Sequence, residues 1–481
     1  MTDYETGWAE EEFAGVELGD ARLNARLIRL CGRLSEAPES PINQACKDWA
    51  ETKAAYRFFN NENVSTDEVF AAHRRKTADR VKGYNTVLAL QDTSYLVYTS
   101  HSTTTGLGQI AFQKGQNVDR IYSHGLAMHI CFAITTQGLP LGLLDQQIFA
   151  RQLRPREPGK TDPKDRLPVE EKESYRWLTA LKNANDAVED TRIITVCDRE
   201  ADFYDLFREA QDLSVPVLVR ARGNRPINRQ SGAAGQEVVK LWDYMTAQPV
   251  VGTRSVEIAR QEKKNHNCAR DRRVAAVEVR IGAFQLNPPK NHIKHRTEQL
   301  PNINMSAVYV REFDTPEGEE AVEWMLLTNL PVDSFEDAGE KIDWYALRWR
   351  IEMFFKVLKS GFRVENCRLG TADRLIRYLT VMSIVAWRLF MLTIIARTAP
   401  ESSVAGFLSE NEWKTLFRKM NPNKPFPETP PAIGTAVTWI ARLGGYLARK
   451  SDPPPGTWVL WRGWKRLIDL ADGWAMANQR E

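Results

Sequence analysis

The chain has 481 residues, of which 43% are hydrophobic, and its 65 Lys+Arg and 62 Asp+Glu give a formal net charge of +3. This composition is too apolar and too evenly charged for a disordered chain, and the length suggests roughly three domains of about 150 residues each. The six cysteines form no CxxC pair, which argues against a zinc ribbon or a disulfide framework and indicates a reducing, cytoplasmic environment. The first 20 residues hold seven acids and no Lys or Arg, so they are unlike a signal peptide.

Residues 18–80 are predicted to be helical, with loops at 37–40 and 60–64. One helix in this region would carry a stripe of four arginines beside a stripe of leucines one residue later; the arginines are Arg22, Arg26, Arg29 and Arg33. These arginines could grip a DNA backbone, or they could pair with the acidic arm formed by residues 1–16. We hypothesise that the arm covers the stripe and restrains DNA binding.

The next part of the chain is predicted to alternate between strands and helices. In chain order the expected elements are strands at 86–90, 126–135 and 139–150, a helix at 169–185, a strand at 191–197, a helix at 201–210 and a strand at 215–220. This is the element order of a ribonuclease-H-like mixed sheet. In that architecture the first and fourth strands are neighbours, so Asp92 and Asp198, which follow them, could meet.

Residues from about 224 to 320 are predicted to form a β-rich insertion in this core. The stretch 217–300 has 16 Lys+Arg against seven Asp+Glu, which suits phosphate-backbone binding or simply a solvated charged surface. A strand at 324–328 returns to the core, and a long helix ends near Gly361. The apolar stretch 376–395 is split by Arg377 and Arg388, which predicts a buried core helix and no membrane span.

We therefore expect an α/β protein of three domains. The expected domains are a helical N-terminal DNA-binding domain (1–70), a ribonuclease-H-like catalytic core (71–370) and a helical C-terminal dimerisation domain (371–481).

One helical stretch, 345–359, concentrates polar side chains on a single face. At about 100° per residue, six of its residues fall within an arc of roughly 100°, opposite an apolar face. These six residues are Tyr345, Arg348, Trp349, Glu352, Lys356 and Lys359. Such a face could be an ordinary surface with ion pairs, or it could serve phosphodiester chemistry. Three carboxylates suffice for a two-metal site, and we predict that Asp92, Asp198 and Glu352 form it.

The run CysAspArgGluAlaAsp (197–202) and the spacing of Tyr345, Arg348, Glu352 and Lys359 carry a family resemblance. The pattern Tyr-x2-Arg-x3-Glu-x6-Lys is similar to the signature of DDE transposases of the insertion-sequence-four family. Further pieces of the resemblance extend over almost the whole chain, at 56–65, 171–174, 324–328 and 440–446.

The resemblance implies a cut-and-paste DNA transposase that nicks, forms and opens a hairpin, and joins its ends to target DNA. Asp92, Asp198 and Glu352 match the metal-binding carboxylates, with Mg²⁺ as the cofactor and Mn²⁺ able to replace it. The matching DNA contacts are Tyr345, Arg348, Lys356, Lys359, Trp324, Arg220, Arg222 and Arg57. The implied partners are double-stranded DNA, as transposon ends and as target, and a second copy of the chain in a synaptic homodimer. The implied location is the cytoplasm of a bacterium.

Two other functions fit part of this pattern. A ribonuclease-H-like nuclease would share the carboxylates but would only hydrolyse DNA, without strand transfer. A catalytically silent regulator would bind transposon ends without turnover.

Overall fold

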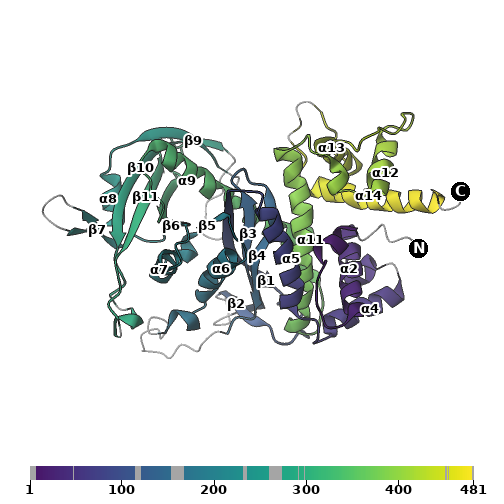
Figure 1. The fold of residues 1–481 in the computed structure, drawn as a ribbon, viewed down its shortest axis with the longest axis horizontal. Coiled ribbons are helices and arrows are strands. Elements are labelled where there is room, and N and C mark those ends of the chain that lie inside the picture. The colour runs from purple at the N-terminus through teal and green to yellow at the C-terminus, as the bar shows by residue number, and fades with distance from the viewer. Residues whose placement is uncertain are drawn as a thin grey trace. The chain divides into compact units, whose positions relative to one another are not determined.

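The structure is a computed structural model, shown in Figure 1. It describes residues 7–46, 48–113, 121–152, 167–230, 236–258, 273–290, 292–296, 298–449, 452 and 454–478. Within them the chain is a mixed α/β protein with helical segments towards both termini, as predicted.

The chain folds into two compact units, which we name by their position in the sequence. The central unit comprises Asn85–Asp92 and Arg154–Trp349. The terminal unit comprises Met1–Tyr84, Thr93–Leu153 and Arg350–Glu481.

The central unit is built on a mixed sheet that begins with three parallel strands, β1, β5 and β6. The remaining strands are antiparallel, and the order across the unit is β1-β5-β6-β12-β11-β10-β7-β8, with β9 also paired to β10. The strands are β1 (Thr86–Val97), β5 (Arg192–Cys197), β6 (Val217–Arg220), β7 (Pro226–Gln230), β8 (Gln236–Lys240), β9 (Gly252–Ile258), β10 (Arg273–Leu286), β11 (Ile303–Glu312) and β12 (Glu323–Thr328). The predicted β-rich region thus supplies β7 to β11, which extend the same sheet.

Helices of the central unit cover this sheet. They are η2 (Val169–Glu171), α6 (Tyr175–Asp186), η3 (Arg199–Ala201), α7 (Tyr204–Asp212), α8 (Leu241–Thr246), η5 (Ile293–Arg296) and α9 (Phe335–Leu347). Trp177 and Leu181 of α6 and Phe207 of α7 pack with strand residues such as Val219 and Leu327 in one buried core. The fully buried strands contain near-continuous apolar runs, as expected for strands covered on both faces.

In the terminal unit, β3 (Ile121–Thr135) pairs antiparallel with β2 (Gly108–Gln113) and β4 (Pro140–Phe149). Both α5 and α11 lie against β4 (Figure 1). The N-terminal helices are α1 (Gly7–Glu12), α2 (Ala21–Glu36), α3 (Ile42–Ala45), α4 (Trp49–Asn60) and α5 (Thr66–Val81). The C-terminal helices are α10 (Trp349–Lys356), η6 (Val357–Gly361), η7 (Val364–Asn366), α11 (Ala372–Thr398), η8 (Val404–Gly406), α12 (Glu410–Met420), α13 (Ile433–Leu443) and α14 (Thr457–Asn478).

Helix α11 is the stretch predicted to be a buried core helix. By length and composition it could cross a membrane, but 78% of its most apolar window is buried inside the protein. It packs against other helices of the terminal unit and against β4, which confirms the prediction of a core helix.

A buried polar cluster attaches α1 to the rest of the terminal unit. Glu12 of α1 receives two hydrogen bonds from the guanidinium of Arg80, at 2.9 and 3.0 Å, and its carboxylate lies 2.6 Å from Nδ1 of His73. The backbone N–H of Leu143 donates to Nε2 of His73 at 3.0 Å, so His73 must be neutral with its proton on Nδ1. Within the acidic arm, Glu12 therefore contacts α5. Residues 1–6 of the arm lie outside the described residues, so its covering of the Arg22–Arg33 stripe stays a hypothesis. In that stripe, Arg22 pairs with Asp20, and Arg33 pairs with Glu36 and Glu51.

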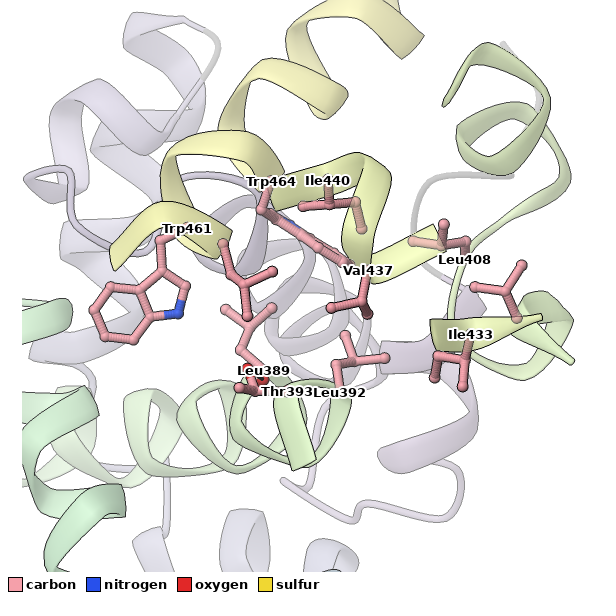
Figure 2. Close-up of a pocket in the computed structure, with 11 residues that line it drawn as sticks. Leu389, Leu392, Thr393, Leu408, Ile433, Val437, Ile440, Trp461 and Trp464 are labelled. Atoms are coloured by element: carbon pink, nitrogen blue, oxygen red, sulfur yellow. Dashed lines mark hydrogen bonds between the residues drawn. The ribbon is translucent and has the colours of Figure 1, made fainter. Parts of the chain in front are cut away.

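The C-terminal helices line an apolar pocket of about 30 Å³ (Figure 2). Its walls come from α11, α13 and α14, including Leu389, Ile440 and Trp464. Helices α13 and α14 meet closely at glycines: a Cβ on Gly463 would lie 1.7 Å from the carbonyl oxygen of Ile440. A side chain at this position would force the two helices apart.

The structure departs from the predicted strands in one way that matters for the site. The first strand was expected at 86–90, but β1 continues to Val97, so Asp92 lies within the strand instead of after it. Its burial changes along its length, from fully buried residues before Asp92 to half-buried ones after it. The apolar run 86–90 predicted only the buried half of β1. The more polar second half of β1 was not predicted, and neither was β2.

Candidate active site

Two aspartates come together at neighbouring positions of adjacent parallel strands. β1 and β5 pair in register up to Gln91 opposite Cys197; Asp92 is the next residue of β1, and Asp198 directly follows the end of β5. Adjacent strands lie about 4.8 Å apart, so the two carboxylates start from neighbouring backbone positions. Asp198 also caps η3, because its Oδ1 accepts the backbone N–H of Glu200 at 2.8 Å. Both residues are half-buried.

A guanidinium lies beside one of these carboxylates. Nη1 of Arg348 is 3.5 Å from Oδ2 of Asp92, and the two side chains are only 15% and 17% exposed. A partly buried cation at this distance offsets the negative charge of the aspartate. The contact brings together two residues that are 256 positions apart in the sequence.

Four of the predicted DNA-contact residues form one cluster in the central unit. The rings of Trp324 and Tyr345 meet edge to face with centroids 5.3 Å apart, and Arg348 lies 5.8 Å from the centroid of the Tyr345 ring. Arg220, at the end of β6, donates to the carbonyl of Glu323 at 2.9 Å. Burial lowers the pKa of Arg220, although a hydrogen bond to Tyr345 raises it, and Arg348 lies close enough to lower it further. The cluster therefore combines two aromatic rings and two cations beside Asp92.

The helix predicted at 345–359 is not a single regular α-helix. α9 ends at Leu347, α10 begins at Trp349, and a π-helical turn follows from Val357 to Gly361. The N–H of Phe362 donates to the carbonyl of Val357 at 2.8 Å, the five-residue spacing of a π-turn. Because that turn contains an extra residue, the angular position predicted for Lys359 at 100° per residue is wrong. Gly361 is not a left-handed cap either: Arg363 has the positive φ, and a Cβ on Gly361 would collide with the Trp461 indole.

The other predicted residues of this stretch belong to the terminal unit. Glu352 is half-buried in the first turn of α10, where Phe354 packs against Phe132 with centroids 5.2 Å apart. Lys356 is exposed, and Nζ of Lys359 donates to the carbonyl of Tyr95 at 2.8 Å. The approach of Glu352 to Asp92 and Asp198 stays a prediction.

The residues suit hard, oxygen-preferring metal ions. Asp92 and Asp198 offer carboxylate oxygens, the donors that Mg²⁺ uses in small numbers together with water. In the described ranges, no group of three or more His, Cys, Asp or Glu side chains is already arranged to hold a metal ion. Among the described residues, Asp92 and Asp198 are two neighbouring carboxylates that could take part in such a site.

The loop that follows β6 carries Arg222, whose side chain is exposed. Its backbone N–H donates to Oδ2 of Asp202 at 2.6 Å. Asp202 was not among the predicted site residues, although it is the last residue of the run CysAspArgGluAlaAsp that carried the resemblance. The only sequence signal for Asp202 was its place at the end of that run, next to the apolar residues Ala201 and Phe203.

Helix α4 presents an aromatic and basic outer face around the predicted Arg57. Trp49 is 77% exposed, Tyr56 is also exposed, and Lys53 lies between them on the same face as Arg57. The opposite face of α4 buries Phe58 and Phe59. Sequence reasoning selected only Arg57, although residues at i, i+4 and i+8 mark the whole face.

Three family models match the chain. The model described as "Transposase DNA-binding" matches residues 5–64, which include α4. The model described as "Transposase DDE domain" matches residues 174–387, and the "Transposase Tn5 dimerisation domain" matches residues 384–480. Asp198, Trp324, Tyr345, Arg348 and Glu352 lie within the second of these segments, whereas Asp92 precedes it.

Proposed function

Because this chain belongs to the DDE transposases of the Tn5 type, we propose that it moves a DNA element by cut-and-paste transposition. It is an enzyme that acts on DNA, and its DNA-binding and dimerisation segments make duplex DNA and a second copy of the chain its partners. The proposal concerns the finer steps: the residues that act, the metal, and the order of cleavage and joining.

One observation carries the proposal: two aspartates lie side by side on parallel strands, next to a cluster of aromatic and cationic side chains. Asp92 and Asp198 follow the pair Gln91 and Cys197, and Arg348 contacts Asp92. We take β1, β5 and β6 with their covering helices as a ribonuclease-H-like core. We propose that Glu352, four residues beyond Arg348, is the third member of an Asp/Asp/Glu triad with Asp92 and Asp198.

The triad would hold Mg²⁺, with Mn²⁺ able to replace it. When bound, divalent ions polarise the scissile phosphate and make a water or a hydroxyl a better nucleophile at neutral pH. The protein supplies the carboxylates that hold the ions and the cations that neutralise the phosphates on either side. Arg220, Arg348 and Lys359 would serve that role, and Lys356 and Arg222, whose side chains are exposed, would assist them.

Two of the proposed steps are hydrolyses by water, and two exchange one phosphodiester bond for another through attack by a 3′-hydroxyl. Water attacks the phosphorus at the end of the element, the P–O3′ bond breaks, and a free 3′-hydroxyl remains on the element. That hydroxyl attacks the opposite strand, which forms a hairpin and releases the flanking DNA. Water then opens the hairpin, and the restored 3′-hydroxyls attack two phosphates of the target DNA, each expelling a target 3′-oxygen.

The aromatic pair suits the hairpin step. A tight hairpin strains its terminal bases, and moving one base out of the stack costs a few kcal/mol. Stacking of that base on an indole recovers roughly 1–3 kcal/mol. Trp324 would stack the base, and Tyr345 and Arg348 would hold the adjoining phosphate.

Two ends must be paired for both to be cut and joined together. The segment 384–480 supplies the homodimer contact, and the segment 5–64, with Arg57 on the outer face of α4, grips the end sequence. We place this reaction in the bacterial cytoplasm, where the DNA lies.

The test is cleavage of DNA carrying the element's own ends, which are the inverted repeats that flank the gene. With Mg²⁺ we expect nicks, hairpins and joined products from the wild type. Asp92→Asn, Asp198→Asn and Glu352→Gln should each lose all three while still binding end DNA, and the exposed Glu336→Gln should behave like the wild type.

The products distinguish the alternatives. Nicks without hairpins or joining would support a nuclease, and binding without any turnover would support a silent regulator. Normal cleavage by a folded Glu352→Gln protein would refute the triad.

A further inference from the structure

A buried carboxylate lies four residues beyond Asp198. The side chain of Asp202 is 0% exposed and forms an ion pair with the guanidinium of Arg225. Its Oδ2 also accepts the backbone N–H of Arg222 at 2.6 Å, and its carbonyl accepts Nη2 of Arg225 at 3.3 Å. Three contacts thus converge on one residue.

These contacts join two segments that both lead to the active site. The turn η3 is flanked by Asp198, its N-terminal cap, and by Asp202, its C-terminal cap. The loop 221–225 follows β6. At its first residue, the N–H of Ala221 donates to the carbonyl of Met325 at 2.7 Å. Asp202 therefore links the turn that carries one candidate metal ligand to the loop that carries Arg222.

A buried carboxylate contributes little to the stability of a fold compared with an apolar residue of similar volume. Removing a carboxylate from water is costly, and apolar residues of similar volume often stabilise a fold as well or better. Oδ1 of Asp202 has no hydrogen-bond partner among the described residues, so the charge depends on Arg225 and on the Arg222 N–H. Burial raises the pKa of Asp202, and the Arg225 cation opposes that rise. A buried charge with so few partners restricts the positions of the segments that carry them, because the charge is stable only while both partners stay in place.

We propose that Asp202 is a positioning residue, which holds the loop 221–225 against the Asp198 turn and so sets where Arg222 meets the DNA. The inference rests on the proposed function, because Arg222 matters only if DNA is held at Asp198. It assigns Asp202 no contact with DNA or with the metal.

The first test measures the single-turnover rates of nicking and joining in a complex already formed with end DNA. We expect Asp202→Ala to slow both rates at least tenfold, while the affinity for end DNA stays within twofold. Asp202→Asn should slow nicking and joining less, because its amide oxygen can still accept a hydrogen bond from the Arg222 N–H. Asp205→Asn is the matched control: this carboxylate, three residues further on, accepts a hydrogen bond from His292 at 2.8 Å.

The second test needs no catalysis. Hydrogen exchange of the Arg222 amide in the free protein should become at least tenfold faster in Asp202→Ala and change little in Asp202→Asn. Amides of the β10–β11 pair should exchange as in the wild type, which separates a local release from general destabilisation.

The outcomes distinguish this inference from the proposed function. If the wild type cleaves and Asp202→Ala cleaves as fast, or if the Arg222 amide is unaffected, the positioning role is refuted and the transposase function stands. If the wild type does not cleave its own ends, the proposed function fails and the inference falls with it.

Discussion

Removing the carboxylate of Glu12 should destabilise the terminal unit measurably. The side chain of Glu12 is 7% exposed, and its partners are Arg80 and a neutral His73. Burial alone would raise the pKa of Glu12, but His73 and Arg80 outweigh burial and lower that pKa from 4.5 to about 2. A shift of that size corresponds to about 3 kcal/mol in favour of the folded state. Loss of one partner from a buried ion pair gives a similar figure, about 3–5 kcal/mol.

The change to test is Glu12→Gln, followed by thermal unfolding with calorimetry at pH 7. A unit of about 280 residues unfolds with an entropy near 0.6 kcal/mol/K, so a loss of about 3 kcal/mol should lower the Tm of its transition by about 5 °C. Glu11→Gln, an exposed neighbour on the same chain segment, is the control and should shift the Tm by less than about 1 °C. A Glu12→Gln protein that melts with the wild type would show that the cluster does not hold α1.

The same cluster predicts how stability depends on pH. The pKa of folded Glu12 is depressed, so its contribution is complete above pH 4.5 and is lost as pH falls towards about 2. Burial lowers the pKa of His73, although Glu12 opposes this, so the unfolded chain takes up a proton first as pH falls below 6.5. Both effects destabilise the terminal unit on acidification. Glu12→Gln should therefore flatten the fall of Tm between pH 5 and pH 3 relative to the wild type.

Three further predictions concern packing, the hairpin and the metal. Gly463→Ala should lower the Tm by a few degrees, because its Cβ would meet the Ile440 carbonyl and overpacking costs about 1–3 kcal/mol. Gly473→Ala on the same helix, where a Cβ would have nothing within 4 Å, should not lower the Tm. Equal melting of the two variants would contradict the close contact between α13 and α14. Trp324→Ala should reduce hairpin yield roughly tenfold to hundredfold, since stacking contributes about 1–3 kcal/mol, while the first nick forms at the normal rate; an unchanged hairpin yield on a sequencing gel would argue against the stacking role. Chelation with EDTA should abolish cleavage, and added Mg²⁺ or Mn²⁺ should restore it with end-DNA binding unaffected; cleavage that persists in EDTA would exclude the carboxylate mechanism.

Much of the candidate site could be predicted from the sequence because its signals are local. The strand before Asp198 is a short apolar run, and the run predicts correctly that the aspartate follows the buried strand. The spacing of Tyr345 and Arg348 likewise reflects the helical period closely enough to place Arg348 beside Tyr345.

Other features could not be read in this way because they depend on partners far away in the chain. The extension of β1 past Asp92 does not follow from hydrophobic periodicity, since its second half is only half-buried. The π-turn at 357–361 adds a residue to the helix, where Gly361 faces Trp461 and Lys359 reaches Tyr95. No local pattern encodes either contact.

The sequence by itself determined which residue types stand at the ends and middles of the strands and on the faces of the helices, because burial and helical period leave a local trace. Only the tertiary structure decided which of them meet. It paired Asp92 with Arg348 and gathered Trp324, Tyr345 and Arg220 beside them. It also buried Asp202 against Arg225 and directed Glu12 to Arg80 instead of to the arginine stripe. Charges select their partners by distance and desolvation in the folded chain, and those quantities exist only after the sheet and its helices have assembled.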